Sequence, residues 1–183
     1  MRRIAIGLLA ILGVLITVPV AYVVGYDLVV FQPRVPAIQR LIEMAAQDER
    51  SPSPLVARVI RAGGSQHLSA QVSRLLLMQF NLPPSQSPLQ WHFTSALWWA
   101  LVALHFSDQE QSTLYLSLSY MGNGVNGFAA ASQAQFGASL NSLSLEQVAT
   151  LSVIARAPSA YLESPERLAR VRTALIKRVQ NGL

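Results

Sequence analysis

The stretch from Leu114 to Val179 reads LYLSLSYMGNGVNGFAAASQAQFGASLNSLSLEQVATLSVIARAPSAYLESPERLARVRTALIKRV. Apolar side chains recur in it at helical spacing, and no run alternates as a half-buried strand would. Ser144 and Gln147 have the spacing of a capping box at a helix start. Pro165 suits the first turn of another helix, behind a Ser164 cap. The stretch therefore predicts helices whose apolar faces carry Val148, Leu151, Ile154, Leu168, Val171, Leu175 and Val179.

The residues before this stretch continue the helical pattern. Leu89–Phe106 carries no charge and predicts a buried central helix. Its aromatic side chains Trp91, Trp98, Trp99 and Phe106 favour core packing over a ridge that faces a partner. Ser65 is placed to cap the helix that precedes this central helix. Proline and glycine mark the breaks between these helices, at Pro33, Pro36, Gly63, Gly64, Pro83 and Pro84.

The N-terminal end predicts a membrane anchor. Only 13% of the 183 residues are charged and 51% are apolar, whereas a typical soluble domain is about 25% charged. Ile4–Gly25 is uncharged and long enough to span a bilayer, and it is longer than the apolar core of a signal peptide. Arg2 and Arg3 precede it, which predicts an N-terminus inside and a body outside. We expect residues 1–30 to form the cytoplasmic tip and transmembrane anchor, and residues 31–183 one domain.

Several classes of function are excluded or disfavoured by composition and charge. The chain has no cysteine, which excludes disulfide scaffolds, thiol catalysis and cysteine zinc sites. Six cations lie between Arg156 and Arg178, whereas none lies between Arg74 and Arg156. This basic segment is typical of a solvated helix face, and anionic lipid or an envelope polymer is the alternative partner. Nucleic acid is not an expected partner, because the body of the chain is predicted to lie outside the membrane.

An ordered set of motifs within the opening stretch identifies a family. The set comprises Tyr115-Leu116-Ser117, Tyr120, Gly122-Asn123-Gly124, Gly127, Ala129 to Ala131, Phe136-Gly137, Ala157-Pro158-Ser159 and Tyr161. In order and spacing it resembles the transglycosylase domain of class A penicillin-binding proteins and monofunctional peptidoglycan glycosyltransferases, glycosyltransferase family 51. The resemblance implies an all-α, lysozyme-like domain directly after a single transmembrane helix. It also implies a place at the bacterial cytoplasmic membrane, with the domain on the extracytoplasmic side.

The family's substrate-binding motif is altered but traceable upstream. The segment GGSQHLSAQVSRLLL is similar to the family's donor-site motif with one residue inserted. Ser69 then stands at its second threonine, Gln71 at its second glutamine and Arg74 at its basic residue. Arg172 stands at the family's final arginine. The resemblance implies that these four side chains contact a sugar or diphosphate.

The family's catalytic carboxylates are replaced in this chain. In MAAQDERS, Gln47 stands at the glutamate that acts as general base, and Asp48 at the aspartate after it. In WHFTS, Ser95 stands at the second essential glutamate. An uncharged amide cannot take a proton from the acceptor sugar at neutral pH. Thr113 stands at the glutamate of the fourth motif, so the chain resembles a degenerate member of the family.

We interpret the chain as a membrane-anchored pseudoenzyme of the envelope. It would bind lipid-linked peptidoglycan precursor or glycan, or dock on a peptidoglycan synthase. The alternatives are an active glycosyltransferase with Asp48 or Glu49 as base, a lytic enzyme with Glu43 or Glu49 as acid, and a pure protein-interaction scaffold. The residues themselves predict no metal site, although the resemblance allows a divalent metal on the leaving diphosphate.

Overall fold

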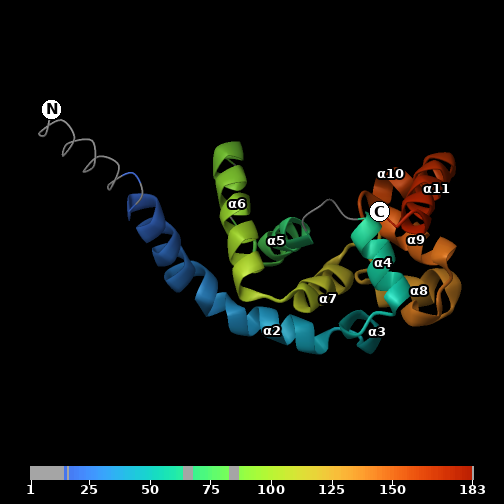
Figure 1. The fold of residues 1–183 in the computed structure, drawn as a ribbon, viewed down its shortest axis with the longest axis horizontal. Coiled ribbons are helices and arrows are strands. Elements are labelled where there is room, and N and C mark those ends of the chain that lie inside the picture. The colour runs from blue at the N-terminus through green and yellow to red at the C-terminus, as the bar shows by residue number, and fades with distance from the viewer. Residues whose placement is uncertain (1–14, 16, 64–67, 83–86, 183) are drawn as a thin grey trace, which may run out of the picture. The chain divides into compact units, whose positions relative to one another are not determined.

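A computed structural model describes residues 15, 17–63, 68–82 and 87–182 of the chain (Figure 1). These residues are helical apart from turns and one isolated bridge between Tyr120 and Asn126. Most of the expected anchor lies outside the described residues, as do Gly64, Ser65, Pro83 and Pro84. Among the helices that are described, none is both long and apolar enough to cross a membrane.

The chain divides into two compact units, Met1–Arg40 and Leu41–Leu183. In the first unit, residues 17–26 are α-helical and lead into a π-helix, η1 (Asp27–Phe31), and a 3-10 helix, η2 (Gln32–Arg34). The break expected at Pro33 is wrong, because the chain stays helical through it, whereas Pro36 lies at the start of a helix, the position that suits a proline. Pro33 lies in the first turn of η2 and Pro36 in the first turn of α2, where a proline's missing N–H has no helical partner to lose. The boundary expected after residue 30 stays a prediction.

The second unit is built from short helices. It begins within α2 (Val35–Met44) and continues as α3 (Gln47–Arg50), α4 (Pro54–Gly63), α5 (Leu68–Gln79) and α6 (Pro88–His105). The part after residue 107 comprises α7 (Asp108–Leu118), α8 (Phe128–Phe136), η3 (Leu140–Ser142), α9 (Leu145–Ile154), α10 (Pro158–Leu162) and α11 (Pro165–Gln180).

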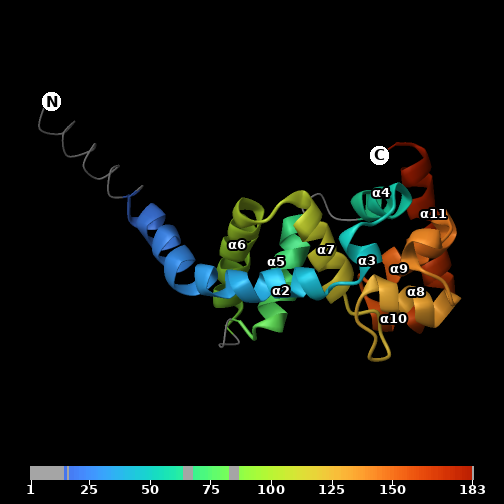
Figure 2. The same ribbon diagram turned by 90° about the horizontal axis from the view of Figure 1, so that it is seen from below.

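Helix α9 is the centre of one part of this unit, where α4, α8, α10 and α11 pack around it (Figure 2). Val148 and Leu151 are fully buried there and Ile154 nearly so, as the apolar spacing predicts. Gly63 allows close contact at this point, because a Cβ on it would lie only 2.5 Å from Ser152 Oγ on α9. In the other part of this unit, α5 packs against α6 and α7. The ring centroids of Trp98 and Phe80 lie 6.2 Å apart there.

The predicted helix ends are confirmed in part. Ser144 Oγ accepts a hydrogen bond from Gln147 N, and Gln147 Oε1 accepts one from Ser144 N, so this capping box forms. Ser164 stands at the N-cap of α11, but its side chain makes no capping bond. The motif residues from Pro158 to Tyr161 form the short helix α10.

The central helix differs from expectation in its burial. Trp98 is fully buried and Phe106 nearly so, whereas Leu89 is 80% and Leu104 73% exposed. Trp99 is also exposed. The sequence of α6 gave no sign of this difference in burial, because large apolar residues occur all round the helix. Only one of its faces packs on α5.

Candidate functional site

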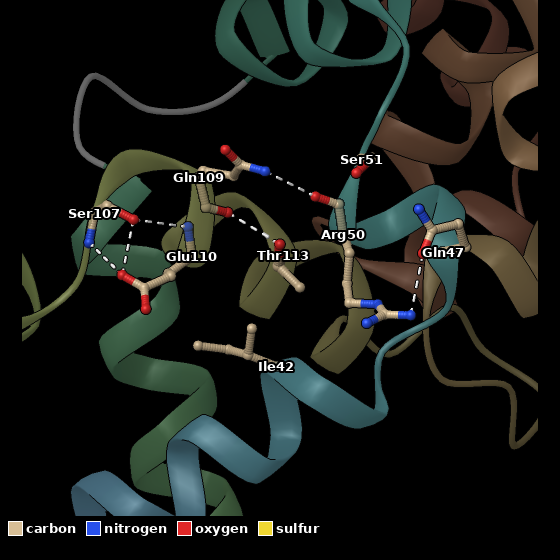
Figure 3. A pocket seen from close by; sticks show the side chains of 8 residues that line it. All are labelled: Ile42, Gln47, Arg50, Ser51, Ser107, Gln109, Glu110 and Thr113. Atoms are coloured by element: carbon tan, nitrogen blue, oxygen red, sulfur yellow. Dashed lines mark hydrogen bonds between the residues drawn. The ribbon is translucent and has the colours of Figure 1, made fainter.

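An open pocket of about 390 Å³ lies where α3 meets the start of α7 (Figure 3). Its lining is mostly polar, with two amides, three hydroxyl side chains, one cation and one carboxylate. The lining residues are Ile42, Gln47, Arg50, Ser51, Ser107, Gln109, Glu110 and Thr113. Two of them, Gln47 and Thr113, stand at positions where the family resemblance places glutamates. The fold therefore brings two of the aligned motif positions to one site.

Gln47 and Arg50 form the α3 side of the pocket. The helix is a single turn, so residues three apart lie one above the other. Arg50 Nη2 donates a hydrogen bond to Gln47 Oε1 at 3.1 Å, and both side chains are exposed. With its oxygen engaged, the Gln47 amide presents N–H donors, as the guanidinium does. This wall of the pocket is suited to an acceptor or an anion.

The start of α7 forms the opposite wall. Ser107 and Glu110 make a capping box, in which Glu110 Oε2 accepts from Ser107 N at 2.8 Å and from Ser107 Oγ at 2.7 Å. Gln109 Nε2 donates to the Arg50 carbonyl at 3.2 Å and thereby links the two walls. Thr113 Oγ1 donates to the Gln109 carbonyl. Acceptors thus dominate this wall.

Glu49 is next to Gln47 in the chain but faces another direction. It is 4% exposed, and its Oε1 accepts a hydrogen bond from Ala129 N at 2.9 Å, in the first turn of α8. Its Oε2 accepts from Ala46 N at 3.2 Å. A carboxylate at a helix N-terminus satisfies amide groups that have no partner within the helix. Glu49 therefore caps α3 and α8 and does not line the pocket.

Asp48 is also held away from the pocket. Its Oδ1 accepts from Asn141 Nδ2 at 3.3 Å and its Oδ2 from Asn141 N at 3.4 Å. The Asn141 side chain further donates to the Ser51 carbonyl at 3.0 Å and accepts from Ser53 N at 2.6 Å. Asn141, on η3, thus fixes the chain that leaves α3. Neither proposed substitute base is among the residues that line the pocket.

The positions predicted on α5 and α6 form a second group. Trp99 Nε1 donates to Ser69 Oγ at 3.2 Å, so an indole occupies the hydroxyl that was expected to meet substrate. Ser95 Oγ is buried and has no hydrogen-bond partner among the described residues. Gln71 is half-buried and Arg74 exposed. None of the four lines the pocket.

Arg172 lies on α11 and makes a different contact. Its Nη2 lies 3.1 Å from Glu146 Oε1 on α9. Nothing in this contact requires a ligand. The described residues also contain no group of three acidic or histidine side chains able to hold a metal ion. The pocket supplies a single carboxylate, so no step is assigned to a divalent metal.

The sequence reasoning missed three residues that matter here: Arg50, Glu110 and Asn141. A signal existed for Glu110, because Ser107-x-x-Glu110 is a capping-box pattern at a helix start. Arg50 was detectable only as the residue three positions after Gln47. Asn141 gave no signal, since its partners are about ninety positions away in the sequence.

Comparison with known proteins identifies the family. The family model described as Transglycosylase matches residues 52–180. Penicillin-binding protein 1A of Neisseria flavescens is 32% identical over 119 residues, which are 64% of this chain and 15% of that protein. Penicillin-binding protein 1A of Neisseria cinerea is 29% identical over 144 residues, 72% of this chain and 18% of that protein.

A shorter match concerns penicillin-binding protein 2a of Streptococcus pneumoniae, 41% identical over 56 residues, 31% of this chain and 8% of that protein. The chain thus spans less than a fifth of the length of these relatives. The family match begins at residue 52, after α3.

Proposed function

This chain belongs to the transglycosylase family, and on that premise we propose that it binds peptidoglycan precursor or glycan at the bacterial envelope without polymerising it. The observation that carries the proposal is the position of the acidic residues of α3. Glu49 caps α8 and Asp48 binds Asn141, so α3 presents to the pocket the amide of Gln47 and the guanidinium of Arg50, and neither of its carboxylates. A general base must lie within hydrogen-bond reach of the proton that it takes.

The pocket itself supports binding. Gln47 and Arg50 offer donors on one wall, and Glu110 with Gln109 offers acceptors on the other. Hydroxyl-rich and anionic groups, such as those of a sugar diphosphate, match this division. Glu110 is the carboxylate of the lining, but Ser107 engages its Oε2 through two donors. We therefore assign Glu110 to the structure of α7 and not to proton transfer.

The membrane part of the proposal rests on the first unit and the resemblance. Val18, Val20, Leu28 and Val29 are each more than half exposed. The sequence from Ile4 to Tyr26, which includes Val18 and Val20, is uncharged and suits an anchor with the N-terminus inside and the domain outside. The proposed location is the cytoplasmic membrane.

The test uses the full-length protein in detergent with lipid-linked disaccharide precursor and divalent metal present. Binding is measured by fluorescence anisotropy of a labelled precursor, and polymerisation by gel analysis of glycan chains. An active transglycosylase assayed in parallel shows that the conditions permit polymerisation. We expect binding without glycan chains.

Three results would overturn the proposal in different ways. Glycan chains would establish an active enzyme, and Asp48→Asn, Glu49→Gln and Glu110→Gln would then identify its base. Neither binding nor turnover would leave a scaffold for a protein partner, such as a peptidoglycan synthase. Release of soluble fragments from sacculi would establish the lytic alternative.

A further inference from the structure

Helix α6 presents an apolar stripe on its exposed side, flanked by the exposed polar side chains of Gln90 and His92. The large members are Leu89, at 80% exposure, Phe93, at 53%, and Leu104, at 73%. They stand four and eleven residues apart, which places them within about 60° of one another around a helix of 3.6 residues per turn. Exposed alanines fill the positions between them on the same side: Ala96, Ala100 and Ala103. We call these six residues the α6 stripe.

The opposite side of α6 is committed to the core of the second unit. Leu97, Trp98, Leu101 and Val102 are buried, and α5 crosses α6 at Trp98 and Trp99. The helix is therefore apolar on both sides, a pattern that belongs to a helix that is covered all round. Large exposed apolar patches mark surfaces for membranes or partners.

The charges around the stripe distinguish these two kinds of cover. No Asp, Glu, Lys or Arg occurs between Arg74 and Asp108, so α6, both its ends and the end of α5 are uncharged. A protein–protein interface needs few charges at its centre but keeps a polar, accessible rim. A bilayer penalises charge over the whole area that enters it. Here the chain on either side of the stripe, from residue 75 to residue 107, lacks Asp, Glu, Lys and Arg as the stripe itself does.

The length of α6 determines how it would meet a bilayer. Its 18 residues extend about 27 Å. One side of the helix stays packed in the core of the domain, so only the exposed side could enter a bilayer. Such a helix lies along the membrane surface with one face among the acyl chains. Met78, near the end of α5, is also exposed, at 63%.

We propose that the α6 stripe is a lipid-contacting surface that seats the second unit on the membrane. Leu89, Phe93 and Leu104 enter the region of the acyl chains. This contact is separate from the pocket and from any anchor in the first unit, and it holds whether or not the domain binds precursor.

The test exploits the absence of native cysteine. Ala100→Cys places one thiol in the middle of the stripe, and Ala134→Cys places one on the exposed face of α8 as a matched control. Each full-length variant is labelled with an environment-sensitive fluorophore and reconstituted into phosphatidylethanolamine–phosphatidylglycerol vesicles, with or without acyl-chain nitroxide lipid. We expect a blue shift and strong nitroxide quenching at position 100, and neither at position 134.

Three outcomes would overturn the proposal. A water-like emission at position 100 would show that the stripe is solvated. A blue shift without nitroxide quenching would show a protein cover, and energy transfer between labelled copies would then identify a dimer. Quenching of equal strength at both positions would show that lipid contact is not specific to α6. Circular dichroism of both variants checks that the helices are intact.

Discussion

The carboxylate of Glu49 on α3 accepts a hydrogen bond from Ala129 N at 2.9 Å, eighty positions later at the start of α8. The same side chain accepts from Ala46 N, so one buried anion serves the first turns of two helices. Glu49 thereby joins α3, which forms one wall of the pocket, to the start of α8, which follows the glycine-rich motif of the family.

Replacement of Glu49 by Gln should destabilise the protein by about 2 kcal/mol, because the amide keeps the shape but loses a charged acceptor for two backbone N–H groups. The measurement is urea unfolding of full-length protein in detergent, followed by circular dichroism. Glu43→Gln on the exposed face of α2 is the matched control and should change the midpoint little. Equal midpoints for the two variants would contradict the capping role.

Replacement of Gly127 by Ala should cost more than the same change at Gly124. Both glycines have positive φ, +87° and +76°, so both alanines bear backbone strain of roughly 1–2 kcal/mol. At Gly127 the new Cβ would also lie 2.8 Å from Glu49 Oε1 and 3.2 Å from the Ser117 carbonyl, whereas Gly124 has open space. Thermal unfolding of both variants compares the costs. A Gly124→Ala midpoint as low as that of Gly127→Ala would refute the close packing of Glu49.

Stability should fall at high pH because of Tyr115. Burial raises the pKa of its phenol, while the Arg156 charge and a hydrogen bond with Ser119 oppose the rise. The folded state therefore holds this proton to a higher pH than the unfolded state, whose tyrosine titrates near 10. The stabilising contribution is present below about pH 10 and is lost as pH rises through the folded pKa.

The Tyr115→Phe variant should lose less stability than the native chain between neutral pH and pH 11. Unfolding midpoints in urea at a series of pH values measure this difference. Tyr120→Phe, at an exposed ring, leaves Tyr115 in place and should retain the alkaline loss. Parallel pH profiles for native protein and Tyr115→Phe would show that Tyr115 is not the cause.

Replacement of Arg50 by Ala should weaken binding of lipid-linked precursor roughly tenfold or more, because hydrogen bonds to a charged group carry about 1.5–3 kcal/mol. Anisotropy titration of labelled precursor measures the dissociation constant. Arg61→Ala, an exposed arginine on α4 outside the pocket, is the matched control. Equal weakening in both variants would indicate general charge attraction and not a pocket contact.

Restoring one carboxylate should not restore polymerisation. Gln47→Glu places an acid beside Arg50, yet Ser95 and Thr113 still stand at the other glutamate positions of the family. We expect precursor binding and no glycan chains in the gel assay. Chains formed by this variant but not by the native protein would show that the remaining machinery is intact.

Local sequence determined the helices and several of their ends. The Ser144–Gln147 box and the buried face of α9 follow from side-chain spacing alone. The family also followed from an ordered set of motifs between Tyr115 and Tyr161, since turn glycines and helix starts are encoded by neighbours in the chain. Gly122, Asn123 and Gly124 all adopt positive φ in the turn that these motifs predict.

Only the tertiary structure decided what each polar side chain does. Asp48 and Glu49 read as adjacent candidates for a base, but one binds Asn141 and the other caps α8. The exposed stripe of α6 and the Trp99–Ser69 bond were equally hidden. Spacing along a helix states which residues share a face. The partner of that face, or of a carboxylate, depends on residues that are 30 to 93 positions away in these cases, and only the packed chain brings them together.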